Sequence, residues 1–379
     1  MLINIKEWLK TRQGQIFLKS FLATMLAVII LVTAGMMIWN RFTRPPDIPP
    51  IEWVQVPTTE PDNEDCDEEP DDNDRDEDED ERELMYVWPI PERFTAEDRR
   101  ELFWTFLIIG LNEGTNANTI MVASYCGVTR EANLVSIPRD VAVRETGNAR
   151  KLSSSYMIGA GGGRGIAGGV TQVQLDVLRI IGFIPDFYVV LDYDAFFTII
   201  DAVGGVDIYV PMRMLYEDPL QDLFIDIQPG WYYNMDSATA LNFVRFRRTN
   251  WWTPYPGISD FQRIQNQQAL IEAVIRELLR PQNLNPFRLH EFVRIFNESI
   301  HTNLTIPEAT YFAFELNHIR RTEEGTDALS TDYFRPVSTS NCGRYYEFLG
   351  PANVLEIVNR TINPFLEDIE SGDLRIVRE

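Results

Sequence analysis

Apolar residues run without a charged interruption through residues 21–39, whose sequence is FLATMLAVIILVTAGMMIW. A helix of this length rises roughly 28 Å, close to the thickness of the hydrocarbon core of a bilayer. A cleaved signal peptide has a shorter apolar region, and a buried core helix normally carries polar positions. The pattern therefore predicts a transmembrane signal anchor at residues 21–39.

From residue 85 onward, short apolar runs alternate with longer stretches in which apolar residues recur at helical spacing. The short runs predict strands at 105–111, 119–126, 133–138, 187–192, 206–210 and 331–338. Helical spacing, with polar caps or terminal glycines in several cases, predicts helices at 170–182, 193–205, 237–244, 259–280, 306–319 and 350–366. We expect an α/β fold with helices flanking a mixed central sheet. No linker-like break interrupts it, so the predicted domain is 85–379, with a core at 105–280 and a C-terminal part at 281–379.

Residues 40–84 separate the predicted anchor from the domain and are rich in proline and acid. Residues 60–83 alone hold seventeen Asp or Glu against two Arg, so the net charge of −23 is concentrated here. Such a composition repels itself and cannot bury enough apolar surface to fold. The alternative, a cation site, lacks the glycine and ligand spacing of an EF-hand loop. We expect a disordered linker.

The charges beside the apolar run predict its orientation. Lys6, Lys10, Arg12 and Lys19 precede it with only Glu7 opposing them, whereas the chain after it soon turns acidic. The positive-inside rule places residues 1–20 in the cytoplasm and the domain outside. The expected location is the cell membrane, crossed once. About twenty cytoplasmic residues are too few for a DNA-binding fold, so we expect no nucleic-acid partner.

Residue usage excludes several chemistries. The three histidines all lie in the last quarter of the chain, which argues against a Ser-His-Asp triad or a histidine zinc site on the central domain. The three cysteines show no CxxC spacing, and pairing of Cys126 with Cys342 stays open. The glycine-rich run 159–169 matches GxGxxG, but no apolar strand precedes it, so we expect a flexible loop.

Arginines gather in three clusters after predicted elements. Arg139 and Asp140 follow a strand, Arg245 and Arg247 follow a helix, and Arg263 opens the long helix. If 244–248 is extended, Arg245 and Arg247 point the same way. Arginine forks bind phosphate, and a helix N-terminus attracts anions. The clusters therefore indicate an anion site, although each arginine taken singly could be a surface residue paired with an acid.

The order of short motifs along residues 105–280 resembles the LytR-CpsA-Psr family, also called cell envelope-related transcriptional attenuator proteins. The motifs are GLN (110–112), NANTIMVAS (116–124), VSIPRD (135–140), KLSSSY (151–156), VLDYDAFFTIIDAVGGVDIYVP (190–211), ATALNFVRFR (238–247) and DFQRIQNQQALI (260–271). The resemblance implies an extracytoplasmic phosphotransferase. Such an enzyme moves an anionic glycopolymer, carried on a polyprenyl pyrophosphate in the membrane, onto peptidoglycan.

The resemblance also assigns site residues. Arg139, Arg245, Arg247 and Arg263 match the arginines that hold the pyrophosphate, and Lys151 lies where it could help hold phosphate. Asp140 would orient Arg139 or act as a base. The lipid tail would lie in an apolar cavity, and the candidate walls are helices 170–182 and 193–205 with Phe196, Phe197, Ile199 and Ile200. The alternative is that these helices form ordinary core.

Asn112 and Asn118 depart from the family pattern, which has aspartates there as ligands of Mg²⁺. Because Mg²⁺ favours carboxylate oxygen, we expect a magnesium site of weakened affinity. Three accounts stay open: the amide oxygens and the pyrophosphate suffice, Glu113 or Asp140 replaces the lost charge, or the domain is metal-independent or catalytically silent. The last account makes the chain a polyprenyl-phosphate-binding pseudoenzyme.

Overall fold

The structure is a computed structural model, and it describes residues 44–49, 96–112, 116–143, 150–221, 223–280, 282–283, 286–316, 329–340 and 345–377. The predicted anchor, nearly all of the acidic linker and Glu113 lie outside these residues. Cys126 is a free cysteine, whereas Cys342 also lies outside. Within the described residues no helix is long and apolar enough to span a bilayer.

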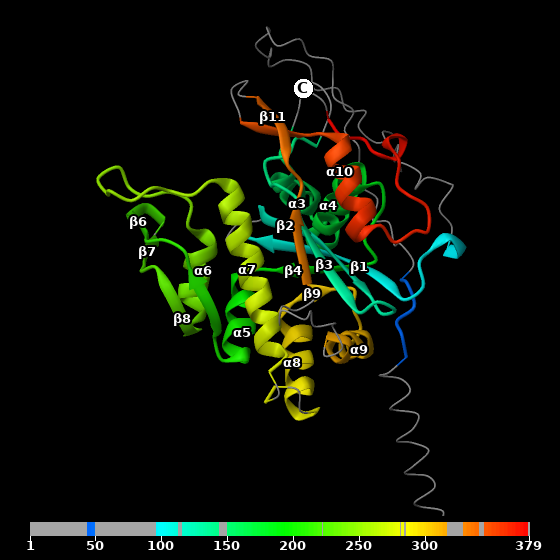
Figure 1. The fold of residues 1–379 in the computed structure, drawn as a ribbon, viewed down its shortest axis with the longest axis horizontal. Coiled ribbons are helices and arrows are strands. Elements are labelled where there is room, and N and C mark those ends of the chain that lie inside the picture. Colours follow the sequence, from blue (N-terminus) through cyan, green and yellow to red (C-terminus); the bar gives the residue numbers. More distant parts are fainter. Residues whose placement is uncertain are drawn as a thin grey trace, which may run out of the picture.

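Six strands form a mixed central sheet in the order β10-β3-β2-β1-β4-β9 (Figure 1). Their bounds are β1 Phe103–Leu111, β2 Ala117–Cys126, β3 Glu131–Ser136, β4 Phe187–Leu191, β9 His301–Thr302 and β10 Leu329–Tyr333. β1 runs antiparallel to β2 and parallel to β4, and β3 runs parallel to β10. The prediction of a mixed sheet is therefore confirmed.

The strand predicted at 331–338 is two strands. β10 ends at Tyr333, and β11 (Pro336–Ser340) pairs instead with β12 (Tyr346–Leu349). Phe334 between them is fully buried, and its N–H donates to the carbonyl of Ser136 at 3.1 Å. Pro336 has no N–H with which to continue the first ladder, so the chain changes partner there.

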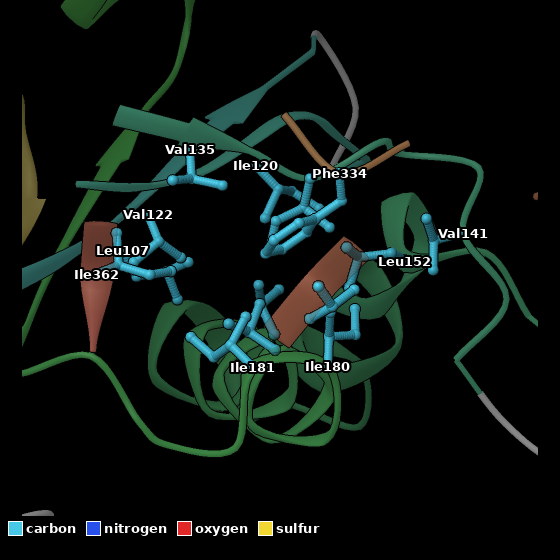
Figure 2. Close-up of a cluster of buried hydrophobic side chains, with 14 of the residues drawn as sticks. Leu107, Ile120, Val122, Val135, Val141, Leu152, Ile180, Ile181, Phe334 and Ile362 are labelled. Carbon is cyan, nitrogen blue, oxygen red and sulfur yellow. The ribbon is translucent and has the colours of Figure 1, made fainter. Parts of the chain in front are cut away.

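The largest core lies between one face of the sheet and three helices, α3 (Ser155–Ala160), α4 (Gly165–Ile181) and α10 (Pro351–Ile357). Figure 2 shows Leu107 and Val122 of the sheet above Ile180 and Ile181 of α4. Leu107, Val122 and Ile181 are completely buried. Alternation along the strands and helical spacing along α4 place these apolar faces together.

The glycine-rich run is not the predicted loop, because only residues 161–164 connect α3 to α4. A Cβ on Gly159 would lie 2.3 Å from the carbonyl oxygen of Gly168, and a Cβ on Gly168 would lie 2.4 Å from that of Gly159. The absence of side chains lets the two helices pack at this short distance. These glycines serve helix packing.

A second core lies between three helices and two pairs of antiparallel strands. The helices are α5 Tyr193–Val203, α6 Ser237–Arg245 and α7 Asp260–Leu278, and the strand pairs are β5 Val206–Val210 with β8 Gly230–Met235 and the hairpin of β6 Met214–Asp218 with β7 Leu223–Ile227. Side-chain caps begin the helices: Asp192 accepts from the N–H of Ala195, and Asp236 from that of Thr239. Ser259 starts α7 with a capping box.

Helix α9 (Ile306–Leu316) covers the sheet near β1 and β4 (Figure 1). Helix α8 (Pro286–Ser299) packs against α5 and α9. Trp104, Phe187 and Tyr311 form an aromatic cluster between α9 and the sheet, in which the Trp104 and Tyr311 rings meet edge to face at 5.7 Å. The Trp104 indole N–H donates to the carbonyl of Pro46 at 3.2 Å, so the chain at residues 44–49 contacts this side of the domain.

The helix predicted at 350–366 ends early. After α10, the chain makes a π-helical turn at Val358–Ile362. Asn363 leaves helical geometry, and Pro364 follows it, which disfavours a helical conformation at the preceding residue.

Candidate functional site

A cavity of about 780 Å³ lies between the carboxyl ends of β1 and β4 and the helices α5, α6 and α7. One part of its wall is apolar: Ile108, Leu111, Phe196, Leu241, Val244 and Leu270. The other part is basic: Arg139, Arg245, Arg247, Arg248 and Arg263. The four arginines predicted from the sequence therefore lie around one cavity, next to an apolar compartment.

A second, more polar cavity of about 470 Å³ adjoins the first. Both are lined by Asn112, Asn118 and Arg139, which therefore stand at their junction, and the second also contains Asp140 and Lys151. The structure thus brings all of the predicted site residues together.

Local structure explains how the arginines converge. Arg245 is the last residue of α6, and the fully buried Phe246 ends that helix. The condition that 244–248 is extended is not met, because the chain is helical up to Arg245, yet Arg245 and Arg247 both line the cavity. Arg263 lies in the first turn of α7, where Ser259 caps the helix.

Arg263 is the most buried arginine of the site, at 6% exposure. Burial, and then repulsion from the Arg139 and Arg247 guanidinium groups, lowers the pKa of Arg263 to about 10, although Asp260 opposes this shift. Its Nη2 lies 2.9 Å from Asp260 Oδ2, whereas Arg247 Nε lies 3.8 Å from Asp260 Oδ1. Arg263 therefore stays charged at neutral pH, and the groups around it carry more positive than negative charge.

Some arginine donors of the site have no acceptor among the residues that the structure describes. Arg139 Nη1 donates to Asn118 Oδ1 at 2.8 Å. Nε of Arg139 and Nε of Arg263 are buried and have no hydrogen-bond partner among the described residues. Buried donors without acceptors are costly, and guanidinium groups bind phosphate oxygens in pairs. Repelling arginines with spare donors are suited to an anion of more than one charge.

Asp140 holds two cations of the site in place. It is 5% exposed, and its Oδ1 lies 2.8 Å from Lys151 Nζ, while its Oδ2 lies 3.8 Å from Arg139 Nε. Lys151 Nζ also lies 5.7 Å from the centroid of the Tyr345 ring. These contacts support the orienting role expected for Asp140, because its carboxylate is engaged by Lys151.

Glu347 is a carboxyl group of this region that no sequence motif identifies. Its backbone N–H donates to the carbonyl of Asp140 at 3.0 Å, and its Oε1 accepts from the Tyr345 hydroxyl at 3.0 Å. Burial, reinforced by the charges of Asp260 and Asp140, raises the pKa of Glu347 against the opposing effects of the Tyr345 hydrogen bond and of Arg263. Glu347 reaches the site because β12 contacts the loop that holds Asp140. The sequence around Glu347 does not predict that contact.

The described residues do not by themselves fit a magnesium site. Asn112 Oδ1 accepts from the N–H of Asn116 at 3.1 Å, and Asn118 Oδ1 accepts from the cationic Arg139. Asp140 is paired with Lys151. No group of three or more acidic, histidine or cysteine side chains in the described part of the chain is placed to hold a metal ion. The expected magnesium site therefore stays a prediction.

The walls of the apolar compartment differ from the expected ones. Phe196 lines the cavity, but Ile200 is 1% exposed within the second core, and the predicted wall at 170–182 belongs to the first core. Helices α6 and α7 supply the walls instead, through Leu241, Val244, Leu270 and Ile271. Helical spacing identifies an apolar face without telling whether protein or a cavity lies against it.

Comparison with known proteins places this site in a family. The sequence pattern of the LytR_cpsA_psr family matches residues 94–358. The polyisoprenyl-teichoic acid–peptidoglycan teichoic acid transferase TagV of Bacillus subtilis (strain 168) is 24% identical over 264 residues. That match covers 66% of this chain and only 60% of TagV. The regulatory protein MsrR of Staphylococcus aureus (strain COL) is 21% identical over 249 residues, which are 63% of this chain and 68% of MsrR.

Solved structures show the same fold. The crystal structure of B. subtilis TagV matches with a TM-score of 0.55 at 20% sequence identity, over 69% of this chain and 96% of that chain. A structure of TagT bound to LIIa-WTA matches with a TM-score of 0.52 at 17% identity, over 70% of this chain and 91% of that chain.

Proposed function

The chain belongs to the LytR_cpsA_psr family, and on that premise we propose that it is a membrane-anchored phosphotransferase. It attaches anionic glycopolymers, carried on polyprenyl pyrophosphate, to peptidoglycan during cell wall assembly. One observation carries the proposal: four arginines converge on an apolar cavity. A polyprenyl pyrophosphate combines these two properties, because a long hydrocarbon chain ends in a polyanion.

The relatives support the substrate class. TagV carries the name of a teichoic acid transferase that acts on peptidoglycan, and the TagT structure contains a WTA ligand. Wall glycopolymers joined by phosphodiesters are anionic, as the arginine end of the cavity requires.

The arginines act by electrostatic stabilisation. With the hydrocarbon chain against Phe196, Leu241 and Leu270, the pyrophosphate lies among Arg139, Arg247 and Arg263. A hydroxyl group of the wall sugar attacks the phosphorus that bears the glycopolymer, its proton is released, and the bond to the leaving polyprenyl phosphate breaks. Donors that are fixed before the reaction stabilise the charge on the leaving phosphate without reorganising. Asp140 keeps Arg139 and Lys151 in position.

Asn112 and Asn118 favour a second candidate function. Both amide oxygens accept hydrogen bonds from protein donors, and neither supplies the charge that Mg²⁺ prefers. The alternative is a pseudoenzyme that binds polyprenyl phosphates without transferring the glycopolymer. In either case the arginines, rather than a metal ion, carry most of the charge neutralisation.

The remaining features of the proposal concern location and partners. We place residues 21–39 in the cell membrane, residues 1–20 in the cytoplasm and residues 85–379 outside. The partners are then the lipid-linked glycopolymer, peptidoglycan and the membrane, with no nucleic acid.

The test uses the full chain in detergent micelles, incubated with a polyprenyl pyrophosphate in either Mg²⁺ or EDTA, and follows both binding and phosphate release. Arg263→Ala should weaken binding roughly 10- to 100-fold, because it removes charge-assisted hydrogen bonds. The matched control is Arg276→Ala, which removes an exposed arginine of the same helix.

The outcomes separate the two functions. Release that depends on Arg263 supports the transferase. Binding that depends on Arg263 without release, also when peptidoglycan is supplied, supports the pseudoenzyme. Equal binding by Arg263→Ala and the wild type contradicts both.

A further inference from the structure

The loop between α6 and α7, whose base lines the arginine cavity, exposes two tryptophans. Trp251 is 91% exposed and Trp252 is 58% exposed, and their rings meet edge to face with centroids 5.6 Å apart. Two adjacent indole rings with this exposure form an apolar patch, and covering that patch with a partner would gain free energy, because apolar surface leaves water.

Hydrogen bonds hold this loop in one shape. The N–H of Ile258 donates to the carbonyl of Arg247 at 2.9 Å and closes the loop at its base. The Asn250 side chain both accepts from the N–H of Glu217 and donates to its carbonyl, each at 2.8 Å, which ties the loop to β6. The Thr249 hydroxyl donates to the carbonyl of Tyr255 at 2.7 Å. The backbone that carries the two indole rings is therefore ordered, so little conformational entropy is lost when the rings bind a partner.

The same frame connects the tryptophans to the site. Arg247 and Arg248, at the base of the loop, line the cavity, as does Tyr216 beside the Asn250 anchor. In Figure 1 this loop lies at the far left of the molecule, whereas residues 44–49, in blue, lie at the opposite side. Residues 44–49 follow the predicted anchor, so the loop lies on the side of the domain opposite the one at which the chain arrives from the membrane.

Three kinds of partner would cover exposed tryptophans: a bilayer, another protein or a carbohydrate. The position opposite residues 44–49 and the exposed carboxylate of Glu217 beside the loop disfavour a bilayer. Two rings form a patch far smaller than the roughly 1,200 Å² that a stable protein interface buries. A pyranose ring matches the size of one indole face, and its C–H groups carry the positive charge that the negative face of an aromatic ring attracts.

We propose that Trp251 and Trp252 form the acceptor subsite, where a sugar ring of the peptidoglycan glycan strand stacks on the indole face. The subsite holds the strand beside Arg247 and Arg248, so that a hydroxyl group of the acceptor meets the phosphorus at the arginines. This inference rests on the proposed function, because it assigns one of that reaction's two substrates to a surface.

The test measures binding of soluble peptidoglycan glycan strands to the full chain in detergent micelles, by calorimetry, together with binding of polyprenyl pyrophosphate in the same preparation. Trp251→Ala combined with Trp252→Ala should weaken glycan binding roughly tenfold or more, as expected for the loss of two aromatic contacts. Binding of polyprenyl pyrophosphate should stay unchanged. Trp251→Phe with Trp252→Phe should restore part of the glycan affinity, because the ring faces are kept.

Trp231→Ala is the matched control, because Trp231 is also 58% exposed but lies on β8, which contributes no residue to the cavity lining, whereas Arg247 and Arg248 at the base of the tryptophan loop do. The proposal is overturned by any of three results: equal glycan binding by the double variant and the wild type, no glycan binding by the wild type, or an equal loss in Trp231→Ala.

A bilayer partner is tested with the chain in nanodiscs that contain brominated lipid. If the double substitution instead reduces the quenched share of the tryptophan fluorescence, with Trp39 of the predicted anchor still quenched, the loop contacts the bilayer and the proposal fails. Failure to bind polyprenyl pyrophosphate would count against the proposed function, independently of the glycan result.

Discussion

Two buried charge clusters of this protein are built in opposite ways. Asp176 is completely buried at the centre of the first cluster. Its carboxylate accepts from Arg150 at 2.5 Å, from Arg179 at 3.0 Å and from Gln172 at 3.1 Å. The protein supplies both the anion at the centre and the donors that surround it, although Arg150 Nε and Nη1 also lack a hydrogen-bond partner among the described residues.

In the second cluster, the site, cations form the centre. Arg139, Arg247 and Arg263 repel one another, and the buried Nε donors of Arg139 and Arg263 have no hydrogen-bond partner in the described part of the chain, although Arg139 Nε lies 3.8 Å from Asp140 Oδ2. The carboxylate of Asp260 offsets only part of this charge. We conclude that the first cluster stabilises the fold, whereas the second lowers the stability of the protein and raises its affinity for an anion.

Removal of the central anion from the first cluster gives the largest expected effect. Asp176→Ala leaves the buried guanidinium group of Arg150 without its carboxylate and should lower the free energy of unfolding by about 3–5 kcal/mol. Arg263→Ala should leave that free energy unchanged or raise it, because repulsion is relieved. Urea unfolding of both variants measures this, with the exposed Asp201→Ala on α5 as control. The contrast between the clusters fails if Arg263→Ala destabilises as much as Asp176→Ala.

Supplying anions to the second cluster tests its charge balance. Asn112→Asp with Asn118→Asp places two carboxylates at the junction of the cavities, where they compete with a pyrophosphate for the arginines. Affinity for polyprenyl pyrophosphate in EDTA should fall about tenfold and recover in Mg²⁺, because carboxylates bind that ion. Titration calorimetry in both buffers measures the change.

The double substitution Asn112→Ser and Asn118→Ser is the control, since it removes the same amides without adding charge. If it reproduces the loss of affinity, the effect comes from the lost amides and the explanation by charge is wrong.

Glu347 gives the smallest expected effect, and it depends on pH. Because burial raises its folded pKa above the ordinary value of 4.5, the wild type loses stability as pH rises through the folded pKa. Glu347→Gln lacks that titration, so it should exceed the wild type in unfolding free energy by about 1 kcal/mol at pH 7 and match it near pH 4. Glu356→Gln, at an exposed position of α10, is the control. A difference that is constant between pH 4 and pH 7 would contradict the assignment.

Features set by short-range patterns were predictable from the sequence. Alternation predicts β1 to β4 closely, and the order of the motifs identifies the arginines and Asp140 that line the cavities. Features that depend on contacts between distant segments could not be predicted from the sequence. The split at Phe334, the proximity of Glu347 to Asp140 and the cavity walls on α6 and α7 all depend on which segment packs against which. The glycine-rich run was misassigned because its composition also suits a loop.

The parallel pairing of β10 with β3 has a consequence for the order of folding. Gly159 and Gly168 are close in sequence, so the crossing of α3 and α4 closes a short loop and can form early. β3 can pair with β10 only after the chain from residue 132 to residue 329 has been synthesised and the two ends of this segment have been brought together. During synthesis β3 is therefore an unprotected edge strand until nearly the whole domain has emerged. The last segment to join the sheet is thus also the one that shields it from aggregation.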